Sequence, residues 1–84
     1  MVMLQEAVND NQRVVTLINV LSGTLSNIDA EFQLELARAK ATSRPDIRPL
    51  VVDRVRRRYE QRREPYVRQI AELRRRIHLA EACA

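Results

Sequence analysis

Apolar residues recur every three or four positions through almost the whole chain, with one interruption near its middle. This spacing is the repeat of one face of an α-helix. Asn11 is the only polar residue on this line in the first half, where the repeating apolar residues are Leu4, Ala7, Val14, Ile18, Leu21, Leu25, Ile28, Phe32, Leu36 and Ala39. Gly23 costs about 1 kcal/mol relative to alanine inside a helix, but the repeat keeps its phase across it. We therefore expect one long helix over about residues 3–42.

The interruption is the stretch ATSRPDIRP, residues 41–49. Proline fixes its own φ angle and disfavours the helical region for the residue before it. Arg44, which precedes Pro45, is thus expected to end the first helix, and residues 43–46 to form a turn. Asp46 is a plausible N-cap for the next helix, and Pro49 would lie in the first turn of that helix, where proline is tolerated.

The second half carries another helical repeat, which predicts a helix over about residues 47–82. The repeating residues are Val51, Val55, Tyr59, Arg62, Tyr66, Ile70, Leu73, Ile77 and Ala80. Pro65 removes one backbone hydrogen bond from this helix. Because the repeat holds its phase across Pro65, we expect a kink there and not two separate helices.

Two long helices joined by one turn predict an all-α antiparallel helical hairpin, with residues 1–84 as a single domain. Folding the second repeat back onto the first sets Ile18 near Ile70 and Phe32 near Val55. A chain of 84 residues buries only about 60% of the surface that it exposes when unfolded, so its own core is marginal.

Several apolar residues lie off both repeats and are surplus to the hairpin core. The predicted partner interface consists of Val15, Val20, Leu34, Leu50, Val67 and Leu79. Burial of such side chains in a second copy or in a helical partner protein would complete a four-helix bundle and offset the marginal core.

Residues 54–76 contain ten arginines, a composition that suggests a surface for nucleic acid. On a helix these arginines do not share one face, and carboxylates are interleaved at spacings of three or four. The expected pairs are Asp53 with Arg57, Glu64 with Arg68, Glu72 with Arg75 and Arg76, and, in the less favourable order, Arg56 with Glu60. Much of the run is therefore expected to be a solvated face that neutralises its own charge.

Four arginines remain as candidates for contact with an anion or with nucleic acid: Arg54, Arg58, Arg62 and Arg74. Arg62 is the least usual of them, because it occupies a position of the apolar repeat. Its guanidinium must reach solvent or meet a carboxylate or phosphate, since a buried unpaired charge is costly.

The sequence offers little for catalysis. It has one histidine, His78, one cysteine, Cys83, and one glycine, which excludes a glycine-rich phosphate-binding loop. We expect no catalytic residue, cofactor, metal site or small-molecule substrate. No stretch approaches the roughly 20 apolar residues needed to cross a bilayer, so we expect no membrane association and a cytoplasmic location.

The net charge of +4 is uneven: residues 1–45 carry −1 and residues 46–84 carry +5, which favours an acidic partner. The leading hypothesis is a non-enzymatic protein–protein interaction module, that is, an adaptor, small chaperone or assembly subunit that acts through coiled-coil-like packing with itself or with a helical partner. The alternative is a small dimeric regulator that binds nucleic acid through the four candidate arginines.

Overall fold

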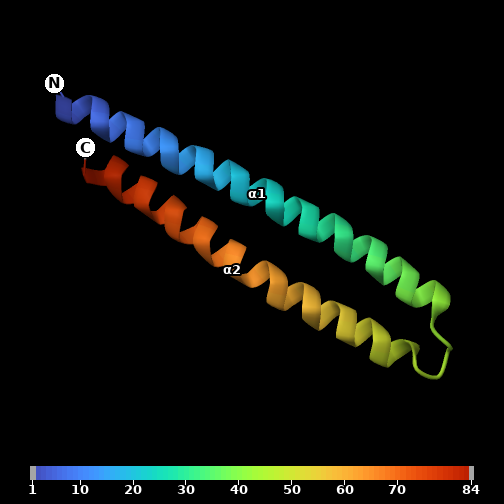
Figure 1. Cartoon of the computed structure of the whole chain (residues 1–84). Coiled ribbons are helices and arrows are strands. Elements are labelled where there is room, and N and C mark those ends of the chain that lie inside the picture. Colours follow the sequence, from blue (N-terminus) through green and yellow to red (C-terminus); the bar gives the residue numbers. More distant parts are fainter. Residues whose placement is uncertain (1, 84) are drawn as a thin grey trace.

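The computed structural model describes the backbone of residues 2–83 and the side chains of residues 10–80. It contains two helices, α1 (Val2–Thr42) and α2 (Arg48–Cys83). They run antiparallel and side by side, so both termini lie at one end and the connection at the other (Figure 1). The fold is thus the predicted all-α helical hairpin. The molecule is a rod with extents of 67 × 17 × 12 Å.

The connection comprises residues 43–47 and is held mainly by backbone hydrogen bonds. The carbonyl of Arg44 accepts from the amides of Ile47 (3.1 Å) and Arg48 (2.9 Å), which starts α2. The Arg48 guanidinium donates to the Ser43 carbonyl at 3.0 Å and ties the two ends of the turn together. The Asp46 carboxylate lies 3.7 Å from Arg44 Nε, and no hydrogen bond from an α2 amide to it occurs among the described residues. The expected Asp46 cap is thus replaced by backbone carbonyls.

α2 continues through Pro65 as one helix, so the expectation that the proline would not split it is confirmed. The half-buried Tyr59 packs on Phe32 on the N-terminal side of the proline, and the buried Ile70 continues the packed face on its C-terminal side. Packing on both sides of Pro65 offsets the loss of one backbone hydrogen bond.

The core is one seam between the helices, centred on the cluster Ile18, Ile70 and Leu73. Val14, Leu21, Leu25 and Ile77 pack against this cluster. The predicted proximity of Ile18 and Ile70 is therefore confirmed. Nearer the turn, Phe32 stacks on Tyr59, which lies one helical turn beyond the expected Val55. The repeat residues Leu4 and Ala7 lie outside the described side chains.

The core is thin. The buried apolar side chains of the described residues are Ile18, Ile28, Ala39, Ile70 and Leu73, and no large side chain there is less than 2% exposed. The solvent-accessible surface is 6956 Å², whereas a compact monomer of this mass exposes about 5,200 Å². The radius of gyration is 19.1 Å, against about 12 Å for a compact domain of this length. Two helices alone therefore leave roughly 1,800 Å² more surface in water than a compact fold would.

Candidate functional site

Large apolar side chains are exposed along the whole hairpin. Five of the six predicted interface residues are exposed: Val15, Val20, Leu34, Leu50 and Leu79. Val67 is half-buried on α2. Sequence reasoning did not single out Leu17, which is 46% exposed beside the buried Ile18. Its position off the repeat was the signal that could have identified it.

These side chains do not form one stripe. Positions on an α-helix advance by 100° per residue, which places Leu17 and Val20 on the flank of α1 that also carries Glu31. Val15 lies on the opposite flank. Leu34 lies on the side of α1 that faces away from α2, and Leu50 and Leu79 lie on the side of α2 that faces away from α1. The exposed apolar surface is therefore distributed around the rod.

Two shallow grooves lie on the half of the hairpin near the termini. One, of about 590 Å³, is lined on α1 by Gln12, Arg13, Thr16, Leu17 and Val20. The other, of about 740 Å³, is lined on α2 by Pro65, Tyr66, Arg68, Gln69 and Glu72. Each groove is lined by both apolar and polar side chains, all from one helix.

A polar cluster spans the seam nearer the turn. The Tyr59 hydroxyl donates to the Asp29 carboxylate at 2.7 Å, and the Tyr59 ring stacks on Phe32 with centroids 4.0 Å apart. The Arg63 guanidinium lies 5.6 Å from the centre of the Tyr59 ring, and its Nε lies 3.7 Å from Asp29. The hydrogen bond to Asp29, together with burial, raises the pKa of Tyr59 above its usual value of 10.0. Asp29 was missed from the sequence, because it lies off the apolar repeat, directly after Ile28.

Arg62 does not occupy the seam position that the repeat assigned to it. Its side chain is 50% exposed and pairs with Glu31 of α1, whereas the side chain of Arg63 is 36% exposed and lies between Tyr59 and Tyr66. The interval of seven residues between the tyrosines accommodates either arginine. Asp29 on the facing helix and the Tyr59 ring favour Arg63. The requirement that Arg62 meet a carboxylate is satisfied within the hairpin.

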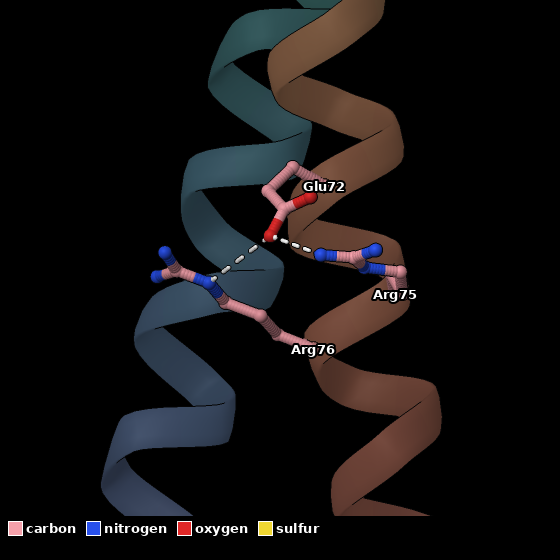
Figure 2. A network of polar contacts seen from close by, with 3 residues as sticks. All are labelled: Glu72, Arg75 and Arg76. Carbon is pink, nitrogen blue, oxygen red and sulfur yellow. Dashed lines mark hydrogen bonds and ion pairs between the residues drawn. The ribbon is translucent and has the colours of Figure 1, made fainter.

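The carboxylates interleaved in the arginine run pair as expected, except Glu60, which has no ion pair with Arg56 among the described side chains. Arg57 lies 3.0 Å from Asp53, and Arg68 lies 3.6 Å from Glu64. The Glu72 carboxylate reaches two guanidiniums, at 3.0 Å from Arg75 and 4.0 Å from Arg76 (Figure 2). All these groups are largely exposed, so each pair stabilises the helix by less than about 1 kcal/mol. Their main effect is to neutralise charge.

The four candidate arginines are not equivalent. Arg54 and Arg58 have no ion pair with any carboxylate whose side chain is described. Arg62 is paired with Glu31. Arg74 lies about 160° around α2 from Arg58 and Arg54, on the other flank, by the 100° rule. Of these four arginines, Arg54 and Arg58 are therefore the two that share a flank of α2 and have no ion pair with a described carboxylate.

Residues 10–80 contain no cluster of three or more histidine, cysteine or acidic side chains able to hold a metal ion. His78 is exposed, and the side chain of Cys83 lies outside those described. Neither α1 nor α2, as far as each is described, combines the length and apolar character needed to span a membrane.

Comparisons of this chain with protein-family models, with curated proteins and with solved structures found no match.

Proposed function

We propose that the hairpin is a non-enzymatic protein–protein interaction module, an adaptor, small chaperone or assembly subunit. It acts through coiled-coil-like helix packing with a second copy or with another helical protein, and this packing completes a four-helix bundle. The observation that carries the proposal is the excess of exposed surface over a compact monomer, together with the exposed large apolar side chains.

The excess of about 1,800 Å² is more than twice the roughly 800 Å² that each partner buries in a standard interface. Exposed apolar side chains such as Val20 and Leu34 would supply the driving force, since each contributes about 1.5 to 3 kcal/mol when fully buried. The absence of a large side chain below 2% exposure in the described part also supports a fold that is completed from outside.

The test is the mass of the complex, measured by analytical ultracentrifugation over a range of protein concentrations. Wild type is expected to associate with itself or with a helical partner from the native host. Val20→Glu and Leu34→Glu place charges at exposed sites, so they should leave the helical content unchanged and abolish association. Asn19→Glu and Gln33→Glu, at neighbouring exposed positions, are the matched controls and should associate normally.

A fully folded monomer at all concentrations, with no helical partner, would contradict the proposal. So would equal loss of association in the control variants, because that result would assign the effect to added charge and not to lost apolar contact.

A second candidate function is a dimeric regulator that binds nucleic acid through arginines of α2. Its support is the unpaired pair Arg54 and Arg58. The ion pair of Arg62 with Glu31 weakens it, as does the position of Arg74 on the other flank. Two results would support this function: an affinity for an oligonucleotide that falls steeply with rising salt, and loss of this binding in the variant Arg54→Glu/Arg58→Glu. No binding at low salt would contradict it.

A further inference from the structure

Positive charge is concentrated at the turn end of the rod. Residues 38–58 contain eight cationic residues and two carboxylates, a net charge of +6, whereas the whole chain carries +4. Both carboxylates are already paired, Asp46 with Arg44 and Asp53 with Arg57. The cationic residues of this segment without an ion pair among the described side chains are Arg38, Lys40, Arg48, Arg54, Arg56 and Arg58. The turn end is therefore a strongly electropositive tip.

An exposed leucine lies among these cationic residues. Leu50 is 72% exposed, more than any other large apolar side chain in the described part, and Ile47 is exposed in the turn. A groove of about 420 Å³ is lined by Leu50, Asp53, Arg54, Arg57, Arg58 and Gln61. From Leu50 to Gln61 the groove follows about 16 Å of α2, or three helical turns.

We propose that this tip groove is a docking site for an acidic amphipathic helix of a partner protein. One apolar side chain of the partner packs on Leu50, and its carboxylates meet the planar, bidentate guanidiniums of Arg54 and Arg58. Leu50 also belongs to the predicted partner interface, so the inference rests in part on the proposed function. Its test can fail independently, because loss of peptide binding at Arg54 and Arg58 leaves association through Val20 and Leu34 untouched.

Charge and composition favour this occupant over two others. No aromatic side chain on which a base would stack lines the groove, because Tyr59, within its span, packs on Phe32 in the seam. Phosphates also offer no apolar contact to the exposed Leu50. A second copy of the chain is less complementary, because two of the four described carboxylates of α1, Asp29 and Glu31, already pair with Arg63 and Arg62. Two tips of +6 would also repel each other.

The tip is held in place before binding. The Arg48 guanidinium bridges to the Ser43 carbonyl at 3.0 Å, and the amide of Val51 donates to Ile47 at 3.1 Å. Pro45 and Pro49 restrict the backbone further. Docking therefore orders little of the chain, which lowers the entropic cost of binding.

The test is titration of the full chain with a labelled synthetic helix in which glutamates surround leucines at three- and four-residue spacing, followed by fluorescence anisotropy. Two control peptides replace the glutamates by glutamine or the leucines by alanine. We expect binding that weakens with salt, and each control peptide should bind at least about tenfold more weakly.

Variants locate the site. Arg54→Gln/Arg58→Gln should weaken binding about tenfold, whereas Arg68→Gln/Arg75→Gln removes the same charge elsewhere and should change it by less than about threefold. Leu50→Ala should weaken binding about fivefold. Leu79→Ala, at an exposed leucine of the other end of α2, should have no effect. Far-ultraviolet circular dichroism verifies that each variant is folded.

Four results would overturn the proposal: no binding of the acidic helix at low salt, equal weakening by Arg54→Gln/Arg58→Gln and Arg68→Gln/Arg75→Gln, no effect of Leu50→Ala, or tighter binding of an oligonucleotide or of anionic lipid vesicles through the same two arginines.

Discussion

Replacement of Tyr59 by phenylalanine isolates one hydrogen bond across the seam. The change removes the hydroxyl that donates to Asp29 at 2.7 Å. It keeps the ring that stacks on Phe32 at 4.0 Å and lies 5.6 Å from the Arg63 guanidinium. Any change in stability therefore reports on the hydroxyl and its partner.

The magnitude follows from the setting of the bond. A hydrogen bond to a charged group contributes about 1.5 to 3 kcal/mol when well buried. The side chain of Asp29 is 44% exposed and Tyr59 is half-buried, so solvent competes and we expect about 0.5 to 1.5 kcal/mol. For a chain of 84 residues, 1 kcal/mol shifts the melting temperature by roughly 6 °C. Tyr59→Phe should thus melt about 3 to 9 °C lower.

A double-mutant cycle provides the assay. Tyr59→Phe, Asp29→Ala and the double variant are unfolded by urea at one fixed protein concentration, because association would make stability depend on concentration. The coupling free energy should be about 0.5 to 1.5 kcal/mol, because the loss of the Arg63 ion pair in Asp29→Ala cancels in the cycle. Coupling below about 0.3 kcal/mol would refute the view that this bond stabilises the hairpin.

Three further predictions concern stability. Gly23→Ala should raise the free energy of unfolding by about 0.5 to 1 kcal/mol, because an added Cβ meets no atom within 4 Å; a destabilised variant in thermal unfolding would contradict this. Ile18→Ala should cost about 2 to 3 kcal/mol and Ile18→Val about 0.5 to 1 kcal/mol in urea unfolding, since Ile18 belongs to the buried cluster; equal costs would place Ile18 outside the core. The folded protein holds the Tyr59 proton more tightly than the unfolded chain, so stability should fall as pH rises from about 10 through the folded-state pKa. Tyr59→Phe should lose less stability over that range, and parallel pH curves would contradict the assignment.

Hydrophobic periodicity was sufficient to predict the two helices and their antiparallel arrangement. The repeat keeps its phase on each side of Pro45, with polar residues only at Asn11 and Arg62, and a short connection permits little other than a hairpin. The same phase argument predicted that α2 would continue through Pro65. The paired charges of α2 were also predictable, because Asp53 and Arg57 interact within one helix at a fixed spacing.

Features that depend on the facing helix were harder to predict. Arg62 and Arg63 both fit between the tyrosines, and only the position of Asp29 distinguishes them. The prediction that Asp46 caps α2 was wrong, because the carbonyl of Arg44 accepts hydrogen bonds from the amides of Ile47 and Arg48. Local spacing contains no information on which carbonyl or carboxylate lies across a turn or a seam.

The directions of the surplus apolar residues were the least predictable part of the candidate site. Sequence reasoning identified Leu34 and Leu50 as surplus, and both are exposed. It also grouped Val67 with them, although Val67 is half-buried. Whether such residues form one face depends on how each helix is rotated about its axis, which is set by the whole seam and not by any single residue.

The single connection of residues 43–47 also orders the folding reaction. Every contact between the helices is nested around it, so Phe32 and Tyr59 close a much shorter loop than Ile18 and Ile70 do. Each doubling of loop length costs about 0.6 kcal/mol of closure entropy. The folding route with the lowest entropic cost therefore forms the contacts between the helices in order, from the turn toward the termini. Substitutions near the turn should therefore slow folding, whereas those at Ile18 or Ile70 should mainly speed unfolding.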